Sequence, residues 1–531
     1  MYTKKTKLYY LVLIIAFFSF CITTNETFTE DFDFEDLESL DIPERTVTFH
    51  TDSCVPVTEI CDLITNCDPG GICLQQILLN NIYKYTNTIN VRSLLDSPQY
   101  YFYNCFDGNF FVNTFFNMTP AGYYTIDGTQ ISSYLNTHQP GIINAVGPFC
   151  PDNINVPSIV ELVNPFRIQE RRAGFMLGGR HTHNNWYGKY YFPVYYLERN
   201  FYLNNEEKKR LEEALDLDTG PVSDAEGNAF AREHLITDKI GLGDTRLVLG
   251  YDILENNKAE IKVGAIATIP TAFTWGKGLY GSSFKKNSDH PDFNIQQILS
   301  QCFCNPDQMD TESALEIAKN FGLSVVDKLT ANLLDSSLGN NGHVGLGAFF
   351  EPHHIIDGGT LMKGRICVEY LLPAKEKRFF IQKKDPADFN REYDCSTTAS
   401  AQANVDFLNQ QLIQTLIPCV YDTTIWPGVL LKATAQGNWA YAQRWWVAFG
   451  ADLWFQSKEG FGKIDAPADI RPLLRTDIAQ RPHAVQTKVF AWLDYKTEKK
   501  DWCVSLYVDG TWASFGIGKD YTLAVRFEKA L

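Results

Sequence analysis

The chain has 531 residues, a formal net charge of −16, 45% hydrophobic residues and 14% aromatic residues. This length suits several domains or one large β architecture. An acidic chain without a basic block is a poor candidate for binding phosphates, so we expect no nucleic-acid partner. Beyond the N-terminus no apolar run reaches the length of a membrane-spanning helix, which excludes helical membrane spans there.

The N-terminus has the pattern of an export signal. Three lysines precede an apolar run from Leu8 to Cys21, with small residues suited to cleavage at Ser19 and Cys21. We therefore predict a signal peptide over residues 1–21. A retained anchor is the alternative, but the run is short for a membrane span.

Two further segments precede the main part of the chain. Residues 22–45 are acidic and predict a disordered linker, whereas residues 46–105 are rich in cysteine. We expect this cysteine-rich segment to lie in the periplasm or to plug a lumen. Residues 106–531 form the remaining domain, and no repeat of fixed period occurs in the chain.

Cysteine usage agrees with export. Loss of Cys21 leaves an even number, and the first four of the remaining cysteines lack the C-x₂-C spacing of structural zinc sites. Disulfides are therefore favoured over a metal, and we expect neither metal nor cofactor. The disulfide candidates are Cys54, Cys61, Cys67, Cys73, Cys105, Cys150, Cys302, Cys304, Cys395 and Cys419.

Alternating apolar and polar residues dominate the chain from about residue 106. In 245–252, for example, Leu247 and Leu249 share one face while Arg246 and Asp252 lie on the other. A period of two predicts β-strands with one apolar and one polar face. The predicted strands are 108–117, 171–181, 188–201, 241–254, 258–270, 343–352, 360–372, 428–436, 440–456, 485–496, 501–515 and 519–530.

Short and long connections alternate between these strands, except for the short last connection at 516–518, as they do in an up-and-down barrel with short turns at one end. Turn-forming residues occupy short connections such as 255–258, 357–359 and 437–439, whereas helices are predicted in long ones at 205–215, 311–334 and 399–416. The count predicts twelve strands, or fourteen if a hairpin near Tyr123 was missed. Tyr, Trp and Phe gather near the predicted strand ends, as aromatic girdles do.

These features together resemble a bacterial outer-membrane β-barrel. The resemblance rests on the signal peptide, the alternating strands, the hairpin at 241–273 and the closing strand DYTLAVRFEKAL. In style it is similar to porin-like barrels and to transporters of long-chain fatty acids and aromatic compounds. It implies an all-β transmembrane antiparallel barrel in the outer membrane, with lipid and small solutes as partners.

The polar phase of the predicted strands gives candidate lumen residues. Either these side chains pair and fill a narrow lumen, or their positive field passes anions and acidic solutes. The lumen-lining candidates are Arg246, Lys262, Lys363, Arg365, Lys432, Arg444, Lys488, Arg526, Glu260, Glu369 and Asp452.

The predicted function is an outer-membrane channel or transporter for small solutes. The alternatives are a structural or adhesive surface barrel with disulfide-stapled loops, and a membrane-embedded or secreted hydrolase. No catalytic motif such as G-x-S-x-G or H-E-x-x-H occurs, so we predict no catalytic residue and no enzyme. His353 and His354 are placed in a turn, and His181 and His183 at a strand end.

Overall fold

A computed structural model describes residues 91–101, 106, 108–120, 123–124, 130–131, 168–215, 223–255, 258–277, 330, 334, 336–356, 360–380, 419–442, 444–497 and 501–531. All of them belong to one compact unit, Pro56–Leu531. The predicted signal peptide, the acidic linker and the helix at 399–416 lie outside the described residues, as does almost all of the helix at 311–334.

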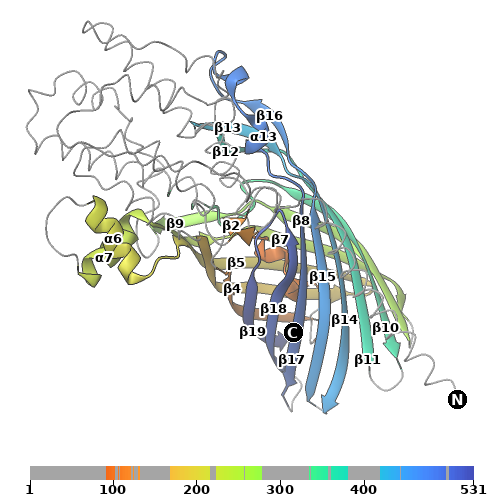
Figure 1. The fold of residues 1–531 in the computed structure, drawn as a ribbon. Helices are drawn as coiled ribbons and strands as arrows, with labels where there is room; N and C mark the ends of the chain where they lie inside the picture. Colours follow the sequence, from red (N-terminus) through yellow and green to blue (C-terminus); the bar gives the residue numbers. More distant parts are fainter. Residues whose placement is uncertain are drawn as a thin grey trace, which may run out of the picture. The chain divides into compact units, whose positions relative to one another are not determined.

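Twelve antiparallel strands close into a barrel (Figure 1). Each pairs with the next along the chain, and the first strand also pairs with the last, in register from Asn109 opposite Ala530 to Met118 opposite Tyr521. In chain order the strands are β1 (Asn109–Met118), β4 (Ile168–His183), β5 (Trp186–Phe201), β7 (Thr245–Glu255), β8 (Ala259–Ile269), β10 (Gly345–Ile356), β11 (Thr360–Leu371), β14 (Gly428–Ala442), β15 (Trp445–Gln456), β17 (Ala484–Lys496), β18 (Trp502–Phe515) and β19 (Tyr521–Ala530).

The fold class and the count of twelve are confirmed. The segment considered as an extra hairpin forms β2 (Tyr123–Tyr124), which pairs with β3 (Gln130–Ile131) in a separate two-stranded sheet instead of joining the barrel. Five turns of two to five residues join strand pairs at one end, which we call the short-turn end. The other end, the loop end, carries five longer connections and the five-residue turn 516–520 between β18 and β19.

Two predicted turns are wrong. Strand β14 continues through Gly437 and Asn438 to Ala442, because both residues pair with β11 on one side and with β15 on the other. Strand β10 continues to Ile356, so His353 lies in a strand opposite Lys363. Histidines and a following Asp-Gly-Gly looked like a turn, but the polar face of the strand extends through them.

Apolar side chains cover the outside of the barrel. Leu247 and Leu249 are exposed while the alternating residues Arg246 and Val248 are buried, and the same alternation runs along the other barrel strands. Exposed aromatic rings lie near both ends, with Trp439 near the short turns and Trp512 near the loop end. However, not every aromatic residue near a predicted strand end belongs to a girdle, since Tyr187, Tyr191 and Trp454 are buried in the interior.

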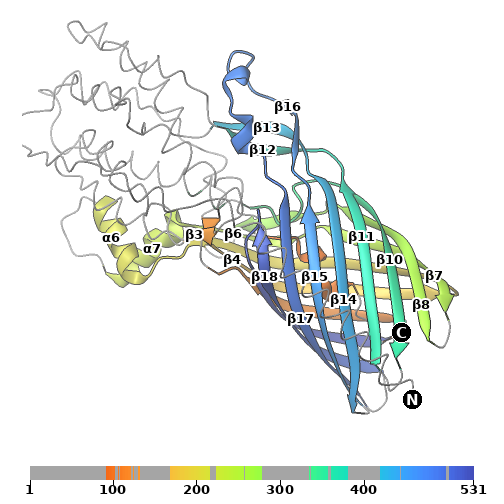
Figure 2. The same cartoon turned by 45° about the vertical axis from the view of Figure 1, so that its right-hand side comes forward.

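The loop end carries the remaining elements. Strand β6 (Ile236–Leu242) pairs with the end of β5, and β9 (Phe273–Lys277) pairs with β6. A three-stranded sheet, the mouth sheet, consists of β12 (Ala374–Phe380), β13 (Cys419–Trp426) and β16 (Gly460–Ile464). Figure 2 shows it at the end of the barrel away from the C-terminus. The helices are α6 (Asn205–Leu215), where one was predicted, α7 (Asp224–His234), α13 (Thr476–Ala479) and the 3₁₀ turns η3 (Leu94–Asp96), η4 (Pro98–Tyr100) and η9 (Arg471–Leu473).

Within the described part of the chain, no helix combines the length and the hydropathy that a membrane crossing requires.

Candidate functional site

Residues 91–101, which we call the plug, lie inside the barrel. Pro98 starts η4, and both 3₁₀ turns are closed by backbone hydrogen bonds such as Tyr100 N–H to the Ser97 carbonyl at 3.1 Å. Leu95 and Tyr100 pack in an apolar cluster with inward side chains that include Phe111 and Tyr191. Nearly every plug side chain is buried, so the plug fills this level of the lumen.

A group of charges ties the plug to the wall. Arg246 Nη2 lies 2.8 Å from Asp96 Oδ1 and 3.1 Å from Glu369 Oε2. Lys432 Nζ contacts the same two carboxylates, at 2.8 Å from Glu369. Arg92 pairs with Asp452 on β15. We call these six side chains the plug cluster; its three cations match its three carboxylates.

The plug cluster also satisfies most of its oxygens with neutral donors. Trp454 Nε1 donates to Asp96 Oδ2 at 3.3 Å, and Thr268 Oγ1 donates to Glu369 Oε1 at 2.6 Å. Thr434 Oγ1 donates to Asp452 Oδ1 at 2.5 Å. Buried ions are tolerated only when paired and hydrogen-bonded in this way, so the cluster fastens the plug.

Hydrogen bonds outside the plug cluster hold the two ends of the plug. Arg172 Nη1 donates to the Arg92 carbonyl at 2.8 Å, and Tyr191 Oη donates to the Tyr100 carbonyl at 2.7 Å. The Asn113 side chain donates to the Gln99 side chain at 3.0 Å. In each of these contacts the barrel wall contributes a side chain, and no backbone ladder joins the described plug residues to a strand.

Below the plug, toward the short turns, lies a cluster with unequal charges, which we call the basic wall. Arg365 Nη1 lies 3.1 Å from Glu351, and Lys262 Nζ lies 2.5 Å from Glu260 and 3.7 Å from Asp252. Five cations thus share this region with three carboxylates and one histidine. The members are Arg180, Lys189, Lys262, Lys363, Arg365, Asp252, Glu260, Glu351 and His353.

His353 bridges two carboxylates of the basic wall. Its Nδ1 lies 2.7 Å from Glu260 Oε2, and its Nε2 lies 2.8 Å from Glu351 Oε1. Both ring nitrogens are therefore engaged with carboxylate oxygens. Neither nitrogen is left to act as a general base.

A third group of buried charges crosses the wall formed by the last strands. Lys488 Nζ lies 3.2 Å from Asp509 and 2.5 Å from Asp520, and Asn117 donates to Asp520 at 2.8 Å. Ser97 of the plug lies 3.4 Å from Asp509. This group therefore joins the plug to the strands opposite the basic wall.

The structure places most of the predicted lumen residues inside the barrel and divides them among these groups. The plug cluster contains Arg246, Lys432, Glu369 and Asp452. Lys488 and Arg526 pair with carboxylates near the last strands. Lys363 is half-buried, and 28% of the Glu260 side chain is exposed. Arg444 stands apart in the short connection between β14 and β15. In full, the inward-facing residues are Arg246, Lys262, Lys363, Arg365, Lys432, Lys488, Arg526, Glu260, Glu369 and Asp452.

Sequence reasoning missed the plug residues Arg92 and Asp96 and the wall residues Lys189 and Glu351. The polar phase of the neighbouring strands could have found Lys189 and Glu351, because each alternates with outward apolar side chains. Of the ten disulfide candidates, nine lie outside the described residues and only the backbone of Cys419 is described. Cys503, which was not among them, is disulfide-bonded, and Cys367 is buried and free.

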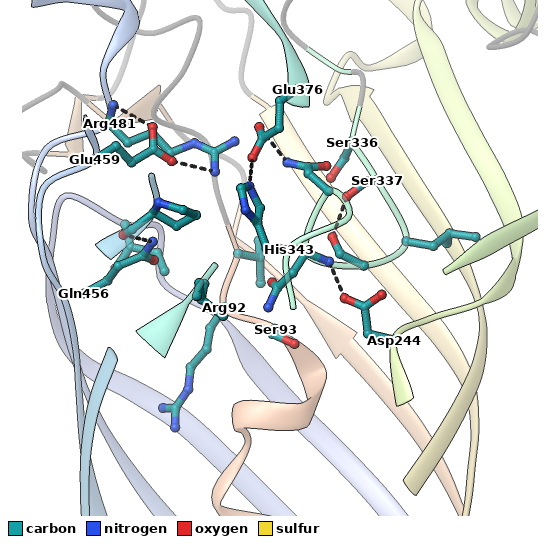
Figure 3. A pocket seen from close by; sticks show the side chains of 18 of the residues that line it. Arg92, Ser93, Asp244, Ser336, Ser337, His343, Glu376, Gln456, Glu459 and Arg481 are labelled. Atoms are coloured by element: carbon teal, nitrogen blue, oxygen red, sulfur yellow. Dashed lines mark hydrogen bonds and ion pairs between the residues drawn. The ribbon is translucent and has the colours of Figure 1, made fainter. Parts of the chain in front are cut away.

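A cavity of about 760 Å³, the vestibule, opens at the loop end above the plug (Figure 3). Plug residues 91–96 line it together with the mouth sheet and the loop at 336–341. Charged and polar side chains lie in its lining beside apolar ones. Examples are Arg92, Arg199, Arg378, Arg481, Asp244 and Glu459.

One polar network supports the vestibule wall. His343 Nε2 contacts Glu376 Oε1 at 2.6 Å, and its Nδ1 contacts the Leu372 carbonyl at 2.7 Å. Arg378 bridges Glu376 at 3.1 Å and Glu459 at 2.8 Å. Burial opposes the charge of Glu376, but Arg378 and the hydrogen bond with His343 outweigh it and lower the pKa to about 2.

Asp244 lines the opposite side of the vestibule. Its carboxylate accepts from the backbone N–H groups of Asn340 at 2.5 Å and Ala272 at 3.3 Å. Burial raises the pKa of this carboxyl, against the effect of those two donors. Asp244 thus fixes the loop at 336–341 against the barrel rim.

No family model matches the chain, and no curated protein matches it. Solved structures do. An outer membrane channel from Pseudomonas putida F1 matches at 10% identity and a TM-score of 0.39, over 82% of this chain and 98% of that one. The Pseudomonas putida toluene transporter TodX matches at 10% identity and a TM-score of 0.29, over 80% and 90%. The β domain of the Bordetella autotransporter BrkA matches at 6% identity and a TM-score of 0.29, over 80% and 100%.

The geometry of the chain itself defines its class. A closed barrel with an even number of strands, an apolar outer surface and charged side chains inside is the architecture of bacterial outer-membrane proteins. The chain is thus an outer-membrane β-barrel, as its sequence predicted.

Proposed function

We propose that this protein is an outer-membrane channel or transporter for small polar solutes, which the plug closes in this structure. The observation that carries the proposal is the vestibule of about 760 Å³, which has a charged lining and the plug as its floor. A cavity of this size accommodates a small molecule. Its charged side chains favour a solute that forms hydrogen bonds over a hydrocarbon.

The way the plug is attached supports passage through the lumen. Side chains hold it, and the closing strands β1 and β19 pair over their full described length without it. Displacement of the plug therefore leaves the ladder of the barrel intact. Only interior contacts must break for a path to open.

The orientation follows from the connections. Outer-membrane barrels place short turns in the periplasm and long loops outside. The vestibule at the loop end then faces the exterior, and the basic wall faces the periplasm. A solute would enter the vestibule first and pass the plug second.

The test is conductance of the purified full-length protein in planar bilayers, beside Asp96→Asn. That variant removes one carboxylate from between Arg246 and Lys432, so we expect more frequent or larger current steps than in wild type. Asp469→Asn, an exposed acid at the mouth, is the matched control and should behave as wild type. Heat-modifiable migration in detergent verifies that each variant is folded.

Absence of current from every folded variant, together with no solute uptake by cells that express them, would reject the channel. The balanced plug cluster would then favour the second candidate, a closed structural or adhesive barrel whose outer loops bind a partner. We propose no enzymatic role. Export through a cleaved signal peptide and disulfides within the cysteine-rich segment remain predictions.

A further inference from the structure

One backbone oxygen of the plug lies between two cations of the basic wall. Lys189 Nζ donates to the Tyr101 carbonyl oxygen at 3.2 Å, and Arg365 Nη1 lies 3.5 Å from the same oxygen. The Arg365 guanidinium also lies 5.1 Å from the centre of the Tyr101 ring. Two cationic donors therefore converge on a neutral acceptor.

The surroundings make a negative acceptor more favourable there. The carboxylates of the basic wall are already engaged, Glu260 by Lys262 and His353, and Glu351 by His353 and Arg365. The cations still outnumber the carboxylates, five to three, in a buried region. Like charges repel strongly where water is scarce, so an added negative group would lower the energy of the wall.

Tyr187 points to the same conclusion. Arg180, Lys189 and Lys262 surround its ring at 4.5, 5.4 and 5.5 Å from the centre. Its hydroxyl is buried and has no hydrogen-bond partner among the described residues. A buried hydroxyl without an acceptor is costly, and an anionic oxygen would supply one.

We infer that the basic wall is a subsite for a carboxylate or phosphate group of the solute, and that the Tyr101 carbonyl occupies it in this structure. The inference rests on the proposed function, to which it adds the solute class: small anions. The solute and the plug then compete for Lys189 and Arg365. Binding of an anion at this subsite favours a displaced plug, because only the state with the plug moved offers both donors.

Hydrogen exchange of residues 91–101 in the purified full-length protein tests this competition without requiring current. Citrate supplies carboxylates and inorganic phosphate supplies phosphate, each compared with sodium chloride at equal ionic strength. We expect at least one of them to speed exchange in the plug of wild type and of Lys189→Arg, which keeps the charge. The anion that acts more strongly identifies the preferred group.

Two variants complete this test. Lys189→Met should lose the anion effect, and Lys463→Met, which removes an exposed lysine of the mouth sheet, should retain it. Equal exchange in all three salts, or an undiminished effect in Lys189→Met, would overturn the subsite whether or not the protein conducts.

Reversal potentials across a potassium chloride gradient give a second measurement. We expect chloride to be preferred over potassium, with the permeability ratio falling by roughly threefold or more in Lys189→Met and staying unchanged in Lys463→Met. Cation preference in wild type, or an unchanged ratio in Lys189→Met, contradicts the inference while leaving the channel itself in place.

Discussion

The plug cluster and the basic wall are neighbours in one lumen, yet their charges are arranged differently. In the plug cluster three cations face three carboxylates, and hydroxyl and indole donors fill further positions on the oxygens. In the basic wall five cations and His353 face three carboxylates. Paired buried charges stabilise a fold. An excess of buried cations destabilises it, so such an excess indicates a role other than stability.

The two regions also correspond to two different predictions about the charged lumen. Paired side chains that fill the lumen were one prediction from the sequence, and a positive field was the other. The plug cluster matches the first arrangement and the basic wall matches the second. A single barrel can contain both, at different depths.

The largest expected difference is between two substitutions, in which one lysine of each region is replaced by methionine. Lys432→Met leaves Asp96 and Glu369 with Arg246 alone, and should lower the free energy of unfolding by about 3–5 kcal/mol, as breaking a buried ion pair does. Lys189→Met relieves repulsion from neighbouring cations and should stay within about 1 kcal/mol of wild type. Denaturant unfolding in lipid vesicles measures both. Equal losses would remove the distinction between the two regions.

The next effect concerns the plug cluster alone. Asp96→Asn keeps the size of the side chain but removes its charge, which should weaken the attachment of the plug by about 1.5–3 kcal/mol. Hydrogen exchange should accelerate in residues 91–101 and remain unchanged in β17 and β18. Uniform acceleration throughout the barrel would instead show that Asp96 stabilises the whole fold.

The polar network of His343, Glu376, Arg378 and Glu459 in the vestibule wall gives a third prediction, at the loop end of the barrel. Glu376 has its pKa lowered to about 2, so its contribution to stability is complete above its unfolded pKa near 4.5 and is lost as the pH falls toward 2. Exchange of β12 and β13 amides, corrected for intrinsic rates, should therefore increase between pH 4.5 and 2, with a loss of about 1.5 kcal/mol.

Glu376→Gln is the control for this pH effect. It should already exchange faster at pH 7 and should show little further change on acidification. A wild-type protein whose mouth sheet exchanges equally at pH 5 and pH 2.5 would contradict the assignment.

Much of the barrel was predictable because the alternation of apolar and polar residues within each strand shows which face points inward. Arg246 and Leu247 alternate within a few residues, and this local pattern gives both the strand and its inward face. The plug was not predictable in the same way. Asp96 follows no period, and its partner Arg246 lies 150 residues away, so only closure of the barrel brings them together. His353 was misplaced because its two carboxylates come from β8 and β10, and a turn motif follows it directly.

The smallest expected effect concerns an exposed ion pair, which serves as the reference for the buried pairs of the lumen. Arg475 and Asp477 pair at 2.7 Å near the mouth, but 63% of the Asp477 side chain is exposed. Water screens such a pair, so Asp477→Asn should change the free energy of unfolding by at most about 0.5 kcal/mol. The same distance that matters greatly inside the plug cluster should matter little here, because burial and not proximity makes an ion pair costly to break. A loss comparable with that of Lys432→Met would mean that the losses inside the lumen reflect general sensitivity of the barrel to charge removal.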